Sequence, residues 1–197
     1  MQLRDMISST YSRHLFLLIC LIAPMMEASA EKADSLLEAK YSAGYIIYDG
    51  KKNVTTMTGH IELTRGTLIV QADHGVVSEG GEKSRNFVLY GAAGGQVFFR
   101  QKRDGGADLW LEGNADRVEY DEKTELVKFI TKARVRYLEG KRVTQEQAGE
   151  FLSYDSLNDV FIATNSSSGK YVPGAGRVTL TIEPKIESKT ELKTEKK

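Results

Sequence analysis

The side chains that most often carry out catalysis or bind metal ions are scarce in this 197-residue sequence. Its one cysteine is Cys20, close to the N-terminus, and the two histidines beyond that region are His60 and His74. Two histidines with no third marked ligand are a weak signal for zinc, which takes three or four protein ligands. No G-x-S-x-G motif marks an activated serine. The residue types therefore argue against a metal site and against nucleophilic catalysis.

Two other patterns could in principle carry chemistry. Acidic residues gather at Asp116, Glu119, Asp121 and Glu122, but two-carboxylate hydrolysis needs a pair at a fixed separation inside a cleft. The glycine-rich stretch 91–95 lacks the Lys-Ser/Thr pair that completes a phosphate-binding P-loop. We interpret the acidic residues as solvated strand faces and turns, and the glycines as a loop. A hydrolase with a carboxylate pair remains an alternative.

Composition fits one folded domain with no affinity for polyanions. Hydrophobic residues make up 41% of the chain, which is enough to form a core. The 27 basic and 27 acidic residues balance, so no strong field is available to attract nucleic acid. The length is that of one domain of ordinary size with processed ends.

The N-terminal region has the pattern of a cleaved export signal. An apolar run over residues 15–23 is followed by Ala28-Ser29-Ala30, the small-x-small sequence that signal peptidase needs. That run is too short to span a bilayer, which takes about 20 residues. We expect residues 1–30 to be removed, a mature domain over 31–184, and a disordered charged tail over 185–197. An uncleaved membrane anchor is the alternative.

Alternation of apolar and polar residues predicts β-strands. It is clearest over 61–64, 68–72, 118–120, 135–137 and 178–182, and it places one set of side chains on each face of a sheet. Eighteen glycines and three prolines fit many tight turns and uninterrupted strands. We therefore predict an all-β sandwich, roll or barrel, with one short helix over 33–40.

A weak repeat runs through the sequence. Residues 43–49, 115–121 and 149–155 each end on Tyr-Asp, and 72–78 is a degenerate fourth copy. After each clear copy a short turn leads into another apolar strand. Repeats of this length indicate stacked units that can form an extended concave surface, although hairpin-rich sequences also give such matches by chance.

The alternation also predicts which side chains point into the fold. These inward candidates are Ile61, Leu63, Leu68, Val70, Leu109, Leu111, Val118, Tyr120, Val135 and Tyr137. Phe98 and Phe99 must point to opposite faces, and the sequence does not say which one points inward. Alternation also leaves open whether the inward side chains pack against one another or line a space for a ligand.

One stretch resembles a known family. Residues 53–73 (NVTTMTGHIELTRGTLIVQAD) are similar to the signature of the OstA-like domain family: an apolar strand, Thr-Gly, an alternating strand, a glycine turn and a strand that closes on Ala-Asp. Ala115-Asp116 closes a second such unit, and residues 176–184 resemble the last strand of the family. The resemblance covers residues 39–184, and Thr131 and Asn165 stand where a turn glycine could be.

The resemblance implies a fold, a ligand and a group of partners. The fold is a twisted, open β-jelly roll of antiparallel strands whose interior accepts the acyl chains of lipid A, with no catalysis and no cofactor. The function is to carry lipopolysaccharide across the periplasm from the inner to the outer membrane. The expected groove residues are Tyr41, Ile61, Leu63, Leu68, Val70, Leu109, Leu111, Val118, Tyr120, Phe129, Val135 and Tyr137.

The resemblance also implies assembly by strand addition at the sheet edges. We expect the first strand over 39–43, bounded by Ala39 and Ala43, at one edge. The last strand should run over 177–182, with Arg177, Val178, Leu180 and Ile182, at the other. The implied partners are a second copy of the chain, an LptC-like inner-membrane protein and an LptD-like outer-membrane protein. A membrane-anchored LptC-like protein and a β-sheet adaptor that binds no lipid are the alternatives.

Overall fold

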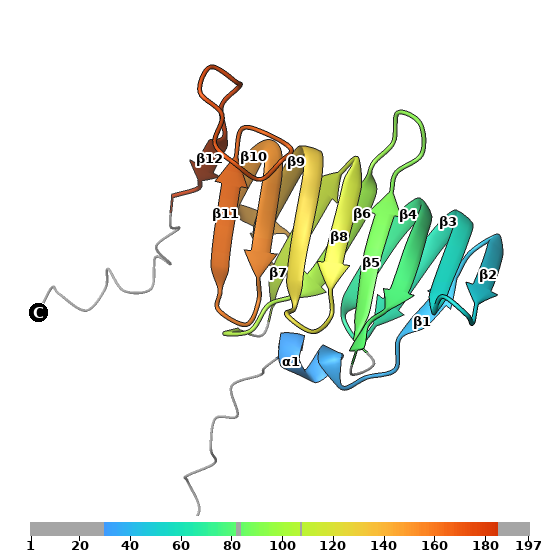
Figure 1. Ribbon diagram of the computed structural model, residues 1–197. Helices are drawn as coiled ribbons and strands as arrows, with labels where there is room; N and C mark the ends of the chain where they lie inside the picture. Colours follow the sequence, from blue (N-terminus) through green and yellow to red (C-terminus); the bar gives the residue numbers. More distant parts are fainter. Residues whose placement is uncertain (1–29, 82–83, 107, 185–197) are drawn as a thin grey trace, which may run out of the picture.

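The computed structural model describes residues 30–81, 84–106 and 108–184; the predicted tail and almost all of the predicted signal peptide lie outside these ranges. The described residues form one short helix and twelve strands (Figure 1), which confirms the predicted all-β class. The elements are α1 (Ala30–Ser35), β1 (Lys40–Ser42), β2 (Tyr45–Asp49), β3 (Val54–Arg65), β4 (Leu68–Glu79), β5 (Arg85–Tyr90), β6 (Val97–Lys102), β7 (Leu109–Ala115), β8 (Arg117–Asp121), β9 (Leu126–Glu139), β10 (Arg142–Asp155), β11 (Val160–Thr164) and β12 (Thr179–Ile182).

The strands form one antiparallel sheet that folds over on itself. Strands β3, β4, β9 and β10 are long enough to belong to both halves. In the first half, sheet I, the order is β2-β3-β4-β5-β8-β9-β10-β11. In the second half, sheet II, the order is β1-β3-β4-β6-β7-β9-β10-β12. Each half therefore contains eight strands, and its first and last strands are the edge strands.

The fold-over occurs at residues with left-handed backbone. In β3 these are Gly59 (φ 80°) and His60 (φ 49°), and in β9 they are Thr131 (φ 65°) and Lys132 (φ 52°). The extra residues bend the strands as β-bulges do, so each long strand passes from sheet I into sheet II. A β-branched threonine rarely adopts this conformation. The carbonyl of Thr131 accepts a hydrogen bond from the N–H of Asp116 at 3.0 Å. The sequence resemblance also marked Thr131 as a position where a turn glycine could stand.

The three clear copies of the repeat share one turn. The carboxylates of Asp49, Asp121 and Asp155 each accept hydrogen bonds of 2.9–3.3 Å from backbone N–H groups two or three residues further on. The backbone hydrogen bond from Thr124 lowers the pKa of Asp121, and hydrogen bonds from the side chain and backbone of Asn158 lower the pKa of Asp155. A residue with positive φ then starts the next strand in each copy: Asn53, Glu125 and Asp159. The repeat in the sequence is therefore a repeat of hairpin geometry.

The predicted element boundaries need correction. The helix runs over Ala30–Ser35 instead of 33–40, because Arg65 donates hydrogen bonds to the carbonyls of Ser35 and Leu37 and the chain then turns. Strand β1 begins at Lys40, where pairing with Thr64 begins. The last strand begins at Thr179, so Arg177 and Val178 precede β12.

Candidate functional site

The inward faces of the two sheets form one continuous apolar interior. In each sheet, residues that are paired from one strand to the next form a row of side chains across all eight strands. The sheet I row is Ile46, Met57, Gly75, Leu89, Val118, Phe129, Leu152 and Ala163. The sheet II row is Tyr41, Leu63, Val70, Phe99, Gly113, Val135, Gln147 and Leu180.

Most of the predicted groove residues lie together in this interior. Eight are buried in the apolar cluster: Ile61, Leu63, Leu68, Val70, Leu111, Val118, Phe129 and Val135. Tyr41, Tyr120 and Tyr137 are partly buried and pack against it. Leu109 is partly exposed and lies outside the cluster. These positions place the residues at the interior surface, and their contact with lipid stays a prediction.

Several interior residues escaped the sequence analysis. Phe99 is 2% exposed and points inward, whereas Phe98 shares the opposite face with its partner Gln71. Other buried side chains that we did not predict include Met57, Phe87, Leu89, Val97, Leu152 and Tyr154. Most lie in strands whose alternation is weak, so only pairing with a known inward residue reveals their direction.

Side chains fill the interior in this conformation. Phe99 of sheet II meets Phe129 of sheet I edge-on, with ring centroids 5.6 Å apart at 88°. The small cavities beside this core include two of about 20 Å³ each, which is room for about one water molecule. A lipid chain therefore requires the two sheets to move apart.

The apolar rows continue uncovered to both ends of the molecule. At one end Ile46 is 45% exposed and Tyr48 is 59% exposed, both on β2. At the other end Leu180 is 58% exposed and Ile182 is 67% exposed, both on β12. Exposed apolar side chains in line with a buried row mark a surface that a further molecule can cover.

An ion-pair network joins the two sheets on the side of the molecule where the β3–β4 and β8–β9 turns lie. We call this the turn side. Arg65, at the end of β3 in sheet II, donates from Nη1 to Oε1 of Glu122 at 2.6 Å. Arg85, on β5 of sheet I, donates to the same carboxylate at 2.8 and 2.9 Å and to the hydroxyl of Tyr41 at 2.7 Å. Tyr41 belongs to β1 of sheet II, so the network crosses between the sheets twice. We call these four residues the latch.

Burial and charge act in opposite directions on the latch carboxylate. Burial disfavours the charged form of Glu122, but the hydrogen bond from Arg85 and the charges of Arg85 and Arg65 outweigh it, so its pKa lies below the ordinary value. Glu122 lies in the turn after β8, but our interpretation that it is solvated is wrong, because its side chain is only 16% exposed. Nearby, burial raises the pKa of Tyr120 to about 12 and keeps its hydroxyl neutral.

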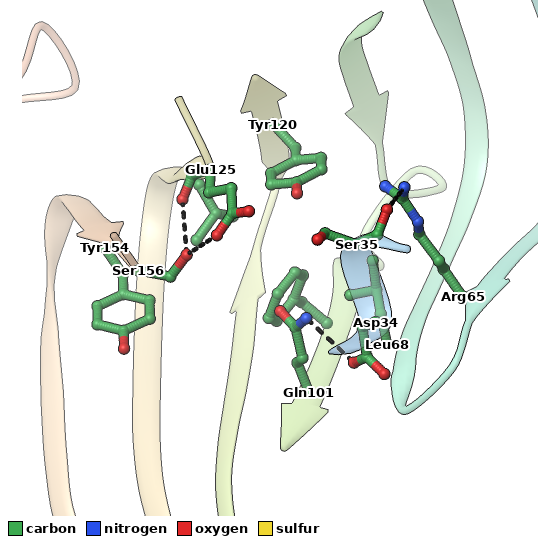
Figure 2. Close-up of a pocket in the computed structure, with 11 residues that line it drawn as sticks. Asp34, Ser35, Arg65, Leu68, Gln101, Tyr120, Glu125, Tyr154 and Ser156 are labelled. Atoms are coloured by element: carbon green, nitrogen blue, oxygen red, sulfur yellow. Dashed lines mark hydrogen bonds between the residues drawn. The ribbon is translucent and has the colours of Figure 1, made fainter. Parts of the chain in front are cut away.

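Helix α1 covers one of the small cavities on the turn side (Figure 2). Asp34 of the helix is 3% exposed and accepts hydrogen bonds from the backbone N–H and hydroxyl of Thr67 at 2.8 and 2.6 Å. Gln101 of β6 donates to the same carboxylate at 3.2 Å. A Cβ atom at Gly66 would lie 2.0 Å from Asp34 Oδ1, so glycine is required where the helix docks.

The other residues that we considered for catalysis or metal binding lie in structural positions. His74 stacks on Tyr90 with ring centroids 5.0 Å apart, and His60 is one of the residues at the fold-over. Residues 91–96 connect β5 to β6 and line a surface hollow of about 470 Å³. In the part of the chain that the structure describes, no group of three His, Cys, Asp and Glu side chains could hold a metal ion. In the same residues, no helix is long and apolar enough to span a membrane.

Three comparisons place the chain among known proteins. Residues 42–159 match the family described as "LptA/(LptD N-terminal domain) LPS transport protein". The lipopolysaccharide export system protein LptA of Haemophilus influenzae is 27% identical over 136 residues, which is 69% of this chain and 71% of that protein.

A solved structure shares the fold. The match is LptH, described as the LptA homologous periplasmic component of the lipopolysaccharide transport device from Pseudomonas aeruginosa, with a TM-score of 0.65. It covers 77% of this chain and 99% of that chain at 16% identity. At that identity the likeness concerns the fold alone, and it supports the predicted jelly roll.

Proposed function

Because this chain belongs to the family of LptA/(LptD N-terminal domain) LPS transport proteins, we propose that it carries lipopolysaccharide across the periplasm from the inner to the outer membrane. The acyl chains of the lipid lie between sheets I and II, and the sugars remain in water. The carrier performs no chemical step. The alternatives of a membrane-anchored LptC-like protein and of an adaptor without lipid are not favoured by the matches to LptA and LptH.

The observation that carries this proposal is the pair of inward-facing rows that cross eight strands each and reach both ends of the molecule. The rows are apolar except at Gln147 of β10. Moving a lipid chain out of water gains about 0.8 kcal/mol per CH₂ group. Several chains therefore cannot cross an aqueous compartment unless an apolar surface shields them. A row that is open at its ends allows a chain to pass on to a second carrier.

Entry of lipid requires the sheets to separate along the turn side. No disulfide can hold them together, because the chain has one cysteine. The sheets are continuous at the fold-over, where β3, β4, β9 and β10 pass from one to the other. On the turn side the latch joins them through side chains, and helix α1 is hydrogen-bonded to Thr67 and to Gln101 of sheet II. Opening there breaks side-chain contacts and leaves every strand pair intact.

The same proposal includes assembly at the two ends. Among the described residues, strands β1 and β2 pair only with β3, and β11 and β12 pair only with β10, so each end offers one free edge from each sheet. Head-to-tail pairing of such edges joins the apolar rows of neighbouring molecules and need not close into a ring. The partners are a second copy of the chain, an LptC-like protein at the inner membrane and an LptD-like protein at the outer membrane.

Residues 1–30 direct the chain to the periplasm in this proposal, and cleavage after Ala30 releases it. Support comes from the export-signal pattern of the sequence and from LptH, which is a periplasmic component. Intact-mass measurement of the protein from a periplasmic fraction tests the cleavage. A chain that begins at Glu31 is expected, and a chain that retains residues 1–30 contradicts it.

Lipid binding is tested by titrating the mature protein with fluorescent lipopolysaccharide. We expect a saturable complex from which unlabelled lipopolysaccharide displaces the probe. The same molecule without its acyl chains should not compete, because it has nothing to place between the sheets. Equal competition by the deacylated molecule would contradict the proposal.

A further inference from the structure

Two arginines from different sheets converge on one carboxylate at the turn side. Arg65 and Arg85 both donate to Oε1 of Glu122, at 2.6 and 2.8 Å, and Arg85 also reaches Oε2. The side chains are 14%, 28% and 16% exposed in the order Arg65, Arg85 and Glu122. Two guanidiniums thus share one carboxylate with little water, and the charge of Glu79, the cross-strand neighbour of Arg85, also acts on this group.

This cluster lies on the rim of the apolar interior. Arg65 and Glu122 are the two charged residues among those that line the second small cavity, together with Tyr41 and Tyr120 as the other polar ones. The rest of the lining is apolar and includes Leu63, Phe87 and Val118. A lipid whose chains occupy this space would bring its polar headgroup to the arginines.

Opening of the turn side would change the partners of the two arginines differently. Arg85 and Glu122 both belong to sheet I, and the backbone N–H of Glu122 also donates to the carbonyl of Arg85 at 3.0 Å. Arg65 belongs to sheet II, so it would lose Glu122 when the sheets part. Arg85 would lose the hydroxyl of Tyr41 in the same movement. A half-buried guanidinium without an anion is costly.

We propose that Arg65 and Arg85 form a binding site for a phosphate group on the headgroup of the transported lipid, with Glu122 holding Arg65 until the lipid arrives. The inference rests on the proposed function and names a contact within it. A phosphate carries close to two negative charges and several acceptor oxygens, and guanidinium groups bind it with two hydrogen bonds each. After the latch has opened, one phosphate can therefore replace Glu122 as the partner of Arg65 and the hydroxyl of Tyr41 as the partner of Arg85.

The test compares variants with opposite expected effects. Arg85→Gln removes one guanidinium, and Glu122→Gln removes the competing charge. Arg142→Gln is the matched control, because Arg142 pairs with Glu139 in the β9–β10 turn, outside the interior. Arg65 is left unchanged because it also holds the carbonyls of Ser35 and Leu37. Thermal unfolding of each variant verifies that it is folded before binding is measured.

The probes are phosphorylated lipid A, the same lipid without phosphates, and inorganic phosphate. Arg85→Gln should weaken binding of phosphorylated lipid A by about tenfold and leave the dephosphorylated lipid unchanged. Glu122→Gln should strengthen binding of the phosphorylated lipid by about tenfold, because it frees the guanidiniums. Arg142→Gln should change neither. Inorganic phosphate should compete only weakly, since it has no chains to bind between the sheets.

Several results would overturn the site. They are an equal loss for both lipids in Arg85→Gln, a loss of phosphorylated lipid in Glu122→Gln, or inorganic phosphate binding as tightly as the lipid. The last result would assign the arginines to free phosphate. If the wild-type protein binds no acylated probe at all, the proposed function fails. If it binds both lipids and the variants match it, only the phosphate site fails.

Discussion

Phe99 of β6 and Phe129 of β9 meet edge-on across the interior, with ring centroids 5.6 Å apart, and they belong to opposite sheets. Gly113 lies beside Phe99 in its row, and a Cβ atom there would be 2.1 Å from Cε1 of Phe129. The ring of Phe129 thus fills the space that a side chain at 113 would take. The two sheets are thus packed against each other through an aromatic contact.

The first prediction concerns this close approach. Gly113→Ala should lower the free energy of unfolding by about 1–3 kcal/mol, because the added methyl group forces Phe129 out of its position. Urea unfolding measures the change. Gly176→Ala is the control, since a Cβ atom there has no neighbour within 4 Å, and it should stay within about 0.5 kcal/mol of wild type. Equal stability of the two variants would contradict the packing described.

The second prediction concerns the free edge of β12. Glu183 donates its N–H to Thr144 of β10 at 2.9 Å, and N–H groups alternate in direction along a strand. The N–H of Leu180 therefore points away from β10, to the free edge, whereas that of Thr181 points to β10. Leu180→Pro should block head-to-tail association and leave the domain stable.

Light scattering over a range of concentrations measures the association, and thermal unfolding measures stability. Thr181→Pro is the matched control, because it removes a donor to β10 and should detach the strand. Normal association of Leu180→Pro would mean that another edge makes the joint. A wild-type chain that stays monomeric at high concentration would contradict self-association itself.

The third prediction follows from the lowered pKa of Glu122. A carboxyl with a lower pKa in the folded protein adds stability above its unfolded pKa, and this stability is lost as the pH falls through the folded value. The ordinary value is 4.5. The stability advantage of wild type over Glu122→Gln should thus be full near neutral pH and shrink below about pH 4.5. Urea unfolding of both proteins across this range tests it, and a constant difference would show that Glu122 does not hold the latch by its charge.

The sequence predicted the all-β class and eight of the nineteen buried residues of the apolar cluster, because alternation is a local property of each strand. It could not orient Phe98 and Phe99, since adjacent apolar residues carry no alternation and only pairing with Val70 places Phe99 inward. It also missed the latch, because Arg65 and Glu122 are 57 positions apart and charge alone does not reveal burial.

The sequence also did not show where helix α1 docks. The carboxylate of Asp34 looks like any residue of a charged segment until Thr67 and Gln101 are brought to it. The turn repeat was found because it is local, since each Asp binds N–H groups only two or three positions away. The fold-over was not found, because Gly59-His60 and Thr131-Lys132 share backbone angles but no residue types.

Adjacent residues of one type on opposite faces allow a direct test of lipid between the sheets. Benzoylphenylalanine in place of Phe99 points its photoreactive group inward, and in place of Phe98 it points outward, at a neighbouring position of the same strand. Tyr120 and Tyr90 offer a second pair, since Tyr120 packs against the interior and Tyr90 stacks on His74. After illumination with lipopolysaccharide in cells, the account predicts lipid adducts at positions 99 and 120 and none at 98 and 90. Equal adduct formation on both faces, or adducts at 98 and 90 alone, would contradict a lipid path through the interior.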